Sequence, residues 1–528
     1  MDTIERNTRH YGHESAKEKK ASMIVPPVIN RAAATAGGVL NKSLFLKRVD
    51  LAAATVANNS QILSWRKALQ QERSLLQVDR LSSVAPHPDK VLAGQGKKCL
   101  LLEPRIRADV PDTWGPVLRE GVRKKELCIM PYELRLDYSF WSYHDIMTAI
   151  LPEEFHGDIP CGFNTAGHVA HLNLRDQFKP YKKLVAEVLL DKNPIIRTVI
   201  NKVDMVGSGS EFRTFQYEVL AGDDNLQVQV SEGGCVFEFD YSKVYWNSKL
   251  EAEHRRIITM LKPGEVLCDV MAGIGPFAVP AGKRGVFVWA NDMNPESYAS
   301  LQHAIGKNKV SPFVRPFNQD GRLFIPFAAD SVLEAHRNAY HAIIPPKRPT
   351  RSRPLEAAPA PTRIPLPPTI AHFVMNLPAS ALTFLRHYRG LYAGQEALFT
   401  SGNNNSNNNK LPMVHVHCFG PKADGEAPLL DVRDRVNAEL AGPGAAAPLR
   451  LGERPEEEDG TVRVRDVRDV APTKSMFCAS FRLPAEVAFA PRERRRPGCS
   501  DDGKPAVVVG DRSVFLPFTH HRLNNHGL

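Results

Sequence analysis

The fold of this chain is decided by the stretch Leu267-Cys268-Asp269-Val270-Met271-Ala272-Gly273-Ile274-Gly275-Pro276, an apolar run that ends in a Gly-x-Gly turn. About twenty positions later follows Asn291-Asp292-Met293-Asn294-Pro295. A buried strand, a glycine turn and an acidic residue at this distance are typical of the first half of a nucleotide-binding α/β sheet, in which the carboxylate holds ribose hydroxyls. Two glycines after an apolar run can also form a simple tight turn, so the glycines by themselves leave both interpretations open.

The third glycine of a dinucleotide-binding loop is absent from this stretch. That glycine lets a helix N-terminus approach a pyrophosphate, and its place is taken here by Phe277-Ala278-Val279-Pro280. A loop with Asp269 before it and with Gly273 and Gly275 within it suits a cofactor without phosphates, whose amino-acid end lies against bare backbone. This describes S-adenosylmethionine, and the stretch resembles the first motif of class I methyltransferases.

Length and composition agree with a globular enzyme. The 528 residues are enough for two or three domains, and 43% hydrophobic and 24% charged residues are ordinary values. The net charge of +10 favours an anionic partner such as nucleic acid without requiring one.

The eight cysteines are scattered, and no two form a C-x-x-C pair. We therefore expect a reducing compartment and neither a disulfide framework nor a metal site. No apolar run reaches the ~18 residues of a membrane span, so no membrane association is expected. The first twenty residues mix acids with bases and hold no apolar core, which argues against a secretory signal. The basic, apolar stretch 41–53 keeps a mitochondrial presequence open.

Composition divides the chain into five parts. We expect a loose N-terminus over 1–25, a helical or α+β region over 26–135, a small α+β domain over 136–241, an α/β domain over 242–491 and a polar tail over 492–528. The first region reads as helical from 26 to 77, with a break at 85–88. The stretch 212–239 alternates like paired strands.

The α/β domain follows the order of a doubly wound sheet. Helices are expected at 251–261, 295–307 and 430–440, and strands at 266–270, 285–290, just before Asn318, 370–375, 413–419, 462–470 and 475–483. These strands would make a seven-strand sheet. Solvated or disordered insertions are expected near 345–368, which is rich in proline, near 402–409, which is rich in asparagine, and near 442–460.

Several linked motifs carry a more specific resemblance. They are Phe212-Arg213, Glu218-Val219-Leu220-Ala221-Gly222, Lys243-Val244-Tyr245-Trp246-Asn247, Leu250, Glu253-His254, Asn291-Asp292-Met293-Asn294-Pro295 and Asn376-Leu377-Pro378. In this order they resemble the archaeal and eukaryotic tRNA (guanine-37-N1)-methyltransferases, over about residues 26 to 483 apart from the insertions.

The resemblance implies a fold, a cofactor and a partner. The fold is α/β, a class I (Rossmann-like) methyltransferase sheet of seven strands preceded by smaller α+β RNA-recognition domains. The cofactor is S-adenosylmethionine, and the partner is tRNA, met at its anticodon stem-loop and body. No motif indicates obligate oligomerisation, so we expect a monomer. We expect it in the cytoplasm and nucleus, with a mitochondrial matrix pool left open.

Methylation of guanine N1 needs a base for the N1 proton and a donor for charge that moves onto O6. Glu253 aligns with the base of the family, and Arg213 aligns with an arginine that stabilises O6. The alternative for Glu253 is a first-turn acid that, together with Glu251, complements the helix dipole, while Arg255 and Arg256 are solvated. The alternative for Arg213 is a surface arginine on an edge strand.

The cofactor residues implied by the resemblance follow strand ends, where open α/β sheets bind ligands. Asp292 would accept from the ribose hydroxyls, Met293 would pack beside the adenine, and Asp320 with Gly321 would meet the adenine edge. His254 aligns with a further cofactor contact. Aspartate and glycine are also common turn residues, and a lone histidine is more often structural, so these alternatives stay open.

Asn376-Leu377-Pro378 resembles the Asn-Pro-Pro-Tyr type of motif of methyltransferases that act on planar nitrogens. The Asn376 amide can donate and accept, and Pro378 stiffens the loop that frames the base. Leu377 replaces the first proline and Ala379 the aromatic residue, which argues against an exocyclic amine as the target. Tyr245 is a candidate wall on which the base stacks, with a core tyrosine as the alternative.

Three functions remain in competition at this point. The first is N1-methylation of tRNA guanosine 37, which is also the first step toward wybutosine in tRNA-Phe. The second is a wybutosine-pathway transfer of the aminocarboxypropyl group from the same cofactor. The third is an RNA-binding protein with a relic cofactor site. The motifs around Asp292 and Asn376 favour the first.

Overall fold

The structure is a computed structural model that describes residues 24–31, 39–203, 212, 214, 216–344, 361–400, 410–441 and 448–492. The chain forms two compact units. Unit 1 runs from the first described residues to Glu232 and from Val236 to Glu251, and unit 2 comprises Gly233–Cys235 and everything described from Ala252 onward. None of the helices in the described part of the chain is both long and apolar enough to span a bilayer.

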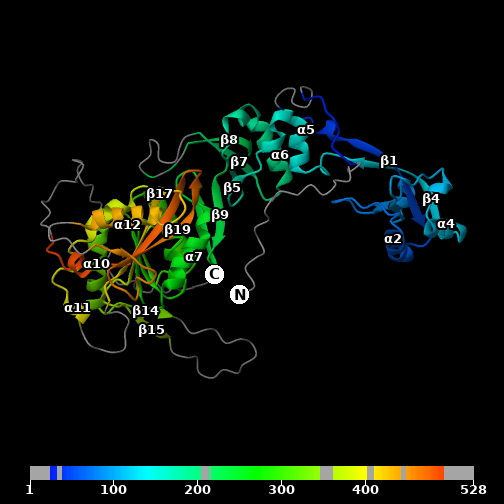
Figure 1. Cartoon of the computed structure of the whole chain (residues 1–528). Coiled ribbons are helices and arrows are strands. Elements are labelled where there is room, and N and C mark those ends of the chain that lie inside the picture. Colours follow the sequence, from blue (N-terminus) through cyan, green and yellow to red (C-terminus); the bar gives the residue numbers. More distant parts are fainter. Residues whose placement is uncertain are drawn as a thin grey trace, which may run out of the picture. The chain divides into compact units, whose positions relative to one another are not determined.

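Unit 1 begins with an antiparallel four-stranded sheet in the order β2-β3-β1-β4 (Figure 1). Its elements are η2 (Lys42–Phe45), β1 (Lys47–Val56), η3 (Asn59–Gln61), α2 (Ile62–Gln71), β2 (Val84–Pro86), α3 (Lys90–Gly94), β3 (Lys98–Leu101), η4 (Pro111–Thr113), α4 (Pro116–Arg123) and β4 (Leu127–Leu136).

A helical pattern was expected over 26–77, but residues Lys47–Val56 within it form strand β1. A break was expected at 85–88, but its first two residues belong to strand β2. The alanine-rich segment of β1 is extended because both of its faces are buried. Leu51 and Ala53 enter one hydrophobic cluster, while Ala52 and Ala54 enter another. Side chains of a strand alternate between faces, so a strand fits between two cores where a helix would not.

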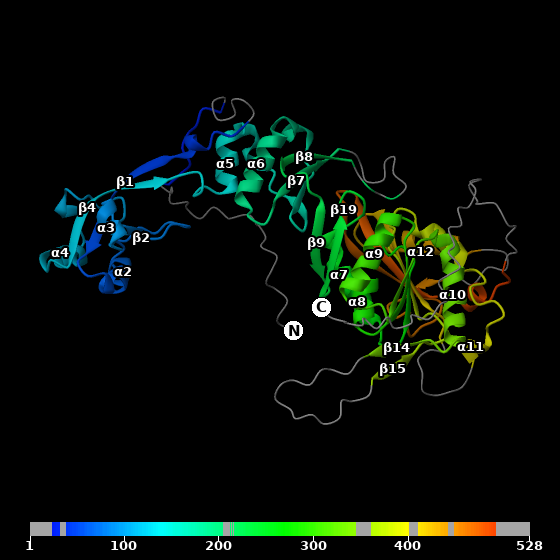
Figure 2. The same ribbon diagram turned by 180° about the vertical axis from the view of Figure 1, so that it is seen from behind.

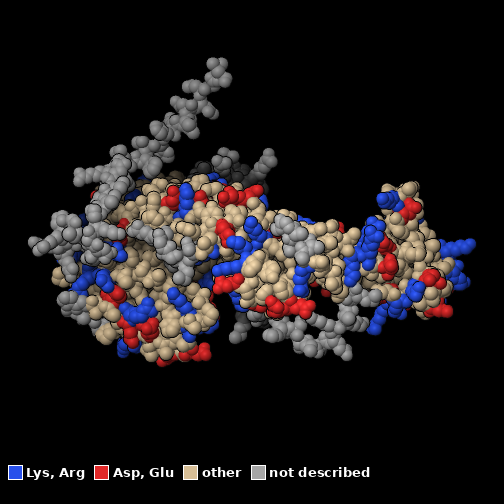
Figure 3. Space-filling model, turned by 90° about the horizontal axis from the view of Figure 1, so that it is seen from above, with Lys and Arg blue, Asp and Glu red and all other residues tan. Residues whose placement is uncertain are grey.

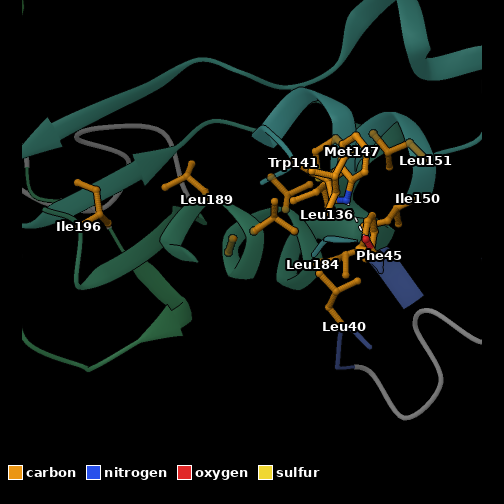
Figure 4. Close-up of a cluster of buried hydrophobic side chains, with 14 of the residues drawn as sticks. Leu40, Phe45, Leu136, Trp141, Met147, Ile150, Leu151, Leu184, Leu189 and Ile196 are labelled. Carbon is orange, nitrogen blue, oxygen red and sulfur yellow. Dashed lines mark hydrogen bonds between the residues drawn. The ribbon is translucent and has the colours of Figure 1, made fainter. Parts of the chain in front are cut away.

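The second sheet of unit 1 has the order β5-β6-β7-β8, and α6 connects its parallel pair β6 and β7. Its elements are α5 (Tyr143–Ile150), η5 (Glu153–Asp158), β5 (Phe163–Ala166), β6 (Val169–Leu172), η6 (Asp176–Tyr181), α6 (Lys182–Lys192), β7 (Thr198–Lys202) and β8 (Tyr217–Gly222). Figure 4 shows apolar side chains of η2, α5 and α6 meeting in one core, where the Trp141 indole N–H donates to the Phe45 carbonyl at 2.8 Å.

A two-stranded pair, β9 (Gln227–Glu232) with β10 (Cys235–Asp240), and the short η7 (Ser248–Leu250) follow before unit 2.

Figure 3 shows basic and acidic side chains interspersed over the face in view.

Unit 2 is built on one sheet in the order β13-β12-β11-β16-β17-β20-β19-β18. Its strands are β11 (Val266–Asp269), β12 (Phe287–Asn291), β13 (Val314–Phe317), β16 (His372–Met375), β17 (Met413–Pro421), β18 (Arg450–Leu451), β19 (Thr461–Ala471) and β20 (Lys474–Arg482). The first five in spatial order run parallel, and β20 is antiparallel to both of its neighbours.

The predicted class I methyltransferase sheet is confirmed, and each of its seven strands lies where the sequence predicts it. The eighth strand, β18, is an addition of two residues at the edge, inside the expected insertion 442–460. Strand order reverses between β11 and β16, and the crevice at such a switch point is where open α/β sheets bind ligands.

Helices cover both faces of this sheet (Figures 1 and 2). They are α7 (Glu251–Met260), α8 (Ala278–Lys283), α9 (Pro295–Lys307), α10 (Gly321–Arg337), η8 (Ala381–Tyr388), α11 (Ala397–Thr400), α12 (Ala427–Leu440) and α13 (Ala485–Ala488). On one face the Trp289 indole of β12 donates to Ser331 of α10 at 3.1 Å.

The expected loop at 345–368 is partly wrong. Residues Thr362–Pro365 form β15, which pairs with β14 (His341–Ile344) as an antiparallel hairpin. Proline has no backbone N–H to donate to a neighbouring strand. Pro365 is tolerated because β15 is an edge strand that pairs with β14 alone among the described strands, so not every residue has to donate. Residues 345–360 of that insertion, together with 402–409, lie outside the described residues.

Candidate active site

The ends of neighbouring strands meet at one edge of the sheet in unit 2. Asp269 ends β11, Asn291 ends β12 and Met375 ends β16. The register places Asp269 directly beside Val374 of β16, so residues that follow β11 and β16 share this edge. The expected cofactor and catalytic residues of unit 2 are therefore attached to adjacent points of the scaffold.

Asp269 is a fully buried carboxylate without a hydrogen-bond partner for either oxygen among the described residues. Burial raises its pKa well above the ordinary value, and the negative charge of Asp292 adds to this, while His417 acts in the opposite direction. A buried carboxylate in this state favours a cation or strong donor as its ligand.

Asp292 is bound by the backbone of the loop that it faces. Its Oδ2 accepts from the Gly273 N–H at 2.8 Å, and its Oδ1 accepts from the Asn294 N–H at 2.9 Å. Burial raises its pKa, and these two backbone N–H groups lower it in part. A carboxylate has about four lone-pair sites, so each oxygen keeps one for a hydroxyl donor.

Two amides that the sequence interpretation assigned no role hold this edge together. Asn291 donates to the carbonyls of Val270 and Gln319 and accepts from the Gln319 N–H at 2.9 Å. Asn318 donates to the carbonyls of Asp292 and Met293. Their partners lie on other strand ends, so local sequence gave no signal for these contacts.

The two glycines of the loop differ in what surrounds them. Gly273 has a φ of +55°, and a Cβ there would meet nothing within 4 Å. Gly275 has a φ of +97°, and a Cβ there would lie 2.6 Å from the Leu301 side chain and 2.9 Å from that of Val279. Gly273 thus borders open space, while Gly275 allows close packing of the helices behind the loop.

These features fit S-adenosylmethionine. Its ammonium group would satisfy the carboxylate of Asp269, its ribose hydroxyls would use the remaining lone pairs of Asp292, and the space beside Gly273 leaves room against bare backbone. The fit rests on acceptors that the described residues leave unused, namely both oxygens of Asp269 and one lone pair on each oxygen of Asp292.

Glu253 lies in the first turn of α7 and is 5% exposed. Its Oε1 accepts from Nη2 of Arg256 and from Nε2 of His417, each at 2.7 Å, and its Oε2 accepts from Nε of Arg256 at 2.7 Å. The alternative from the sequence was that the charged residues of this turn are solvated. It describes the exposed Glu251 and Arg255, but it does not describe the buried Glu253 or its partner Arg256.

Burial by itself would raise the pKa of the Glu253 carboxyl, but hydrogen bonds from Arg256 and His417 outweigh it and hold the pKa well below its ordinary value. His417 is affected in the opposite sense. Burial would lower its pKa, and the neighbouring Cys478 and Glu253 side chains raise it to about 10. The carboxylate and the imidazolium therefore stabilise each other's charged form.

Glu253, His417 and Cys478 also bring three side chains of metal-binding chemistry within 4.8 Å of one another. Arg256 decides against a divalent ion here, because its guanidinium already binds both oxygens of Glu253 and its charge would repel a second cation. The arrangement is better described as a buried ion-pair cluster.

The loop Asn376-Leu377-Pro378 continues from β16. The Pro378 carbonyl accepts from the Phe419 N–H of β17 at 3.1 Å, and the Leu377 carbonyl accepts from the N–H groups of Ser380 and Ala381. The structure gives the Asn376 side chain no hydrogen bond to any described residue. Its amide is half-buried at the sheet edge and is available to a ligand.

The remaining expected cofactor residues lie around the same edge. Met293 is 39% exposed directly after Asp292. Asp320 accepts from the Arg322 N–H at 2.8 Å as the N-cap of α10, the turn role that the sequence left open. A Cβ on Gly321 would lie 3.0 Å from Val270, and the buried His254 ring packs against Phe277.

The structure does not place two of the expected site residues relative to this edge. Arg213 lies outside the described residues. Tyr245 belongs to unit 1, where its side chain is 40% exposed and its hydroxyl accepts from the Asn247 amide at 3.4 Å. The roles predicted for both remain predictions.

Two family models match the chain. Residues 143–225 match the TYW2 N-terminal domain, and residues 228–348 match the TRM5/TYW2 methyltransferase domain. Among solved structures, wild-type Trm5b from Pyrococcus abyssi aligns with a TM-score of 0.48 at 19% identity, over 82% of this chain and 99% of that chain.

Curated relatives are much closer in sequence. The tRNA (guanine(37)-N(1))-methyltransferase of Neurospora crassa is 61% identical over 481 residues, which cover 91% of this chain and 98% of that protein. The protein of the same name in Fusarium vanettenii is 56% identical over 460 residues, covering 87% of this chain and 96% of that protein. The chain therefore belongs to the tRNA (guanine(37)-N(1))-methyltransferase family.

Proposed function

We propose that this protein transfers a methyl group from S-adenosylmethionine to N1 of guanosine 37 in tRNA. The observation that carries the proposal is the buried Glu253 carboxylate, linked through His417 to the sheet edge where none of the described residues hydrogen-bonds to the carboxylate of Asp269. A site for a cationic cofactor and a candidate base thus share one scaffold. The close relatives named for this activity support the reaction.

The cofactor would be held by residues that the edge already orders. Asp269 would bind the ammonium group, Asp292 the ribose hydroxyls, and the Gly273 backbone would border the amino-acid end. Met293 would cover one side of the adenine, and Asp320, Gly321 and His254 would complete the cofactor site. When bound, S-adenosylmethionine supplies an electrophilic methyl group on a sulfonium sulfur, which leaves as the neutral thioether of S-adenosylhomocysteine.

Glu253 would remove the N1 proton of guanine, because N1 becomes nucleophilic only when its lone pair is freed. The proton moves to a carboxylate oxygen, the N1 lone pair forms the bond to the methyl carbon, and the carbon–sulfur pair remains on sulfur. Charge that moves onto O6 would be met by donors, for which Arg213 and the Asn376 amide are the candidates. Pro378 would hold the loop against which the base lies.

The guanine N1 lies on the Watson–Crick edge, so an anticodon-loop base must be splayed out before it can react. Tyr245, with its exposed ring, is the candidate for stacking on that base. The N-terminal part of unit 1 is the candidate for contact with the tRNA body. We propose a monomer as the active form, in the cytoplasm and nucleus.

One assay separates this function from its alternatives. Unmodified tRNA with guanosine 37 is incubated with the full chain and S-adenosylmethionine labelled either in the methyl group or in the carboxyl group, and the nucleosides are then separated. Methyl label in 1-methylguanosine is expected. Carboxyl label in the RNA would indicate aminocarboxypropyl transfer, and the absence of both labels would leave an RNA-binding protein. The Neurospora and Fusarium relatives favour the first outcome.

A further inference from the structure

His417 is a buried histidine of β17 with an acceptor at each ring nitrogen. Its Nε2 lies 2.7 Å from Oε1 of Glu253, and its Nδ1 lies 3.3 Å from the carbonyl oxygen of Met375. A carbonyl and a carboxylate can only accept, so both ring nitrogens must carry a proton. The geometry assigns His417 as an imidazolium. Nothing in the local sequence of β17 distinguishes it from an ordinary buried histidine.

The surroundings of His417 support this charge. Glu253 and Arg256 face it from α7, and Cys478 lies opposite it on β20. The charge of His417 also acts on Asp269 of β11, where it opposes the rise in pKa that burial causes. The neighbouring His415 of the same strand is held in its neutral form, because burial lowers its pKa well below the ordinary value. The cluster thus contains one histidine that is charged and one that is not.

The hydrogen bonds leave one position of the Glu253 carboxylate unused. Of about four lone-pair sites, Oε1 uses two, for His417 and Arg256, and Oε2 uses one, for Arg256. Among the described residues no further donor reaches Oε2. The carboxylate is therefore fixed in one orientation, with a single lone pair that can receive a proton.

His417 also connects Glu253 to the loop that carries Asn376. The Met375 carbonyl, which accepts from Nδ1, immediately precedes Asn376, and Met375 pairs with Val416 across the two strands. One imidazole thus spans the candidate base on α7 and the loop that would frame the guanine. Movement of either would break a hydrogen bond to a charged group, which is among the stronger contacts in a protein.

We propose that His417 is a positioning residue for methyl transfer, which fixes Oε1 of Glu253 so that Oε2 receives the guanine N1 proton and keeps Glu253 in register with the Asn376 loop. The inference rests on the proposed function for the identity of the reaction. The contact that it interprets is independent of that function.

Two isosteric variants separate the two contacts of His417. The amide nitrogen of glutamine replaces Nε2 and keeps a donor for Glu253, whereas that of asparagine replaces Nδ1 and keeps a donor only for Met375. In single-turnover methylation of unmodified tRNA, His417→Asn should lower the rate constant by about 10- to 100-fold, the effect of losing a hydrogen bond to a charged group. His417→Gln should retain more activity, and both variants should bind S-adenosylmethionine as the wild type does.

His415 provides the matched control. It is equally buried on the same face of β17, but its ring nitrogens contact His372 at 3.1 Å and Ser480 at 2.9 Å rather than Glu253. His415→Gln and His415→Asn disturb packing without removing a charge. Rate constants within about twofold of wild type are expected for both, once folding has been checked by thermal unfolding.

A double-mutant comparison tests whether His417 acts through Glu253. If it does, His417→Asn should change the residual rate of a Glu253→Gln protein by less than about twofold, because the carboxylate that it positions is gone. A full 10- to 100-fold loss in that background would overturn the proposal, as would equal activities of His417→Asn and the wild type.

Nitrogen-15 NMR of histidine-labelled protein reads the charge of His417 without any assay of activity. We expect one imidazolium signal that persists at pH 9 and is missing from His417→Gln. A neutral ring at pH 8, or stoichiometric bound metal in the purified wild-type protein, would overturn the assignment. A wild-type protein that fails to methylate tRNA but keeps this signal would refute the proposed function and leave the contact intact.

Discussion

Glu253 and His417 are 164 positions apart in the chain, yet Oε1 of Glu253 accepts a hydrogen bond from Nε2 of His417 at 2.7 Å inside unit 2. The contact joins the first turn of α7 to β17 and buries both side chains. A carboxylate of this kind stays ionised only with a paired cation, and Arg256 and His417 are the two cations that hold it.

Arg256→Ala should destabilise unit 2 by about 2–3 kcal/mol, somewhat less than for a fully buried pair because the Arg256 side chain is 21% exposed. Because the pKa of Glu253 is lower in the folded protein, its ionisation stabilises the fold at every pH above the ordinary carboxyl pKa. This stability is lost as the pH falls below that value toward the folded-state pKa. Without Arg256 that pKa rises, so acid unfolding should begin at a higher pH. Chemical denaturation between pH 3 and 8 measures both effects.

Arg255→Ala is the control for this prediction, since Arg255 is the exposed neighbour on the same helix. It should change stability by no more than about 0.5 kcal/mol, with an unaltered acid transition. Equal destabilisation by the two variants would contradict the ion-pair account.

Asp269→Asn should stabilise the ligand-free protein and abolish its stabilisation by S-adenosylmethionine. The pKa of Asp269 is higher in the folded than in the unfolded protein, so ionisation of this carboxyl favours the unfolded state. The resulting loss of folding stability grows as the pH rises from the ordinary carboxyl pKa toward the folded-state pKa. A rise in Tm of at least about 2 °C corresponds to ~1 kcal/mol in a domain of this size. Calorimetry with and without the cofactor tests both halves.

Asp292→Ala should show the opposite behaviour in the ligand-free protein. It removes the acceptor of the Gly273 and Asn294 N–H groups, so Tm should fall. A lower Tm for Asp269→Asn than for wild type would show that Asp269 has a structural partner.

Alanine at the two loop glycines should separate packing from binding. In Gly275→Ala the added Cβ would lie 2.6 Å from the Leu301 side chain, and alanine would have to adopt a positive φ. The variant should therefore lose about 2–4 kcal/mol of folding stability. Gly273→Ala meets nothing, so it should cost only about 1–2 kcal/mol for its positive φ while weakening cofactor affinity at least tenfold. Thermal unfolding and cofactor titration of the two variants make the comparison.

The parts of the fold that the sequence predicted are those with local signals. Apolar positions that face one side predict a helix over Pro295–Lys307, and α9 has these bounds because Asn294 caps it and Pro295 suits its first position. The strand that ends at Asp269 is a short apolar run closed by glycine. Tertiary burial explains the main error, since the alanines of β1 favour a helix in isolation and a strand between two cores.

The candidate site divides in the same way. Asp269 ends β11, and Asp292 and Asn376 each follow a strand directly, so the order of the sheet brings their attachment points together. His417 and Asn291 act through partners on other elements, which no spacing along the chain encodes, whereas Arg256 pairs with Glu253 three positions earlier on α7. The order of the doubly wound sheet predicts a strand over 413–419, but the partner of His417 depends on how α7 packs in unit 2.

The central claim is that Glu253 is the base for methyl transfer to guanine N1, and one comparison tests it most directly. Wild-type protein and the Glu253→Gln variant are tested in separate reactions, each in excess over tRNA that carries guanosine 37. Methyl-labelled S-adenosylmethionine is added, and the formation of 1-methylguanosine is followed in a single turnover. Glu251→Gln, on the exposed neighbouring glutamate, serves as the control. We expect label at N1 of guanosine 37 at similar rates for wild type and Glu251→Gln, and a rate at least about 100-fold lower for Glu253→Gln with intact cofactor binding. A Glu253→Gln protein that methylates at the wild-type rate would contradict the account.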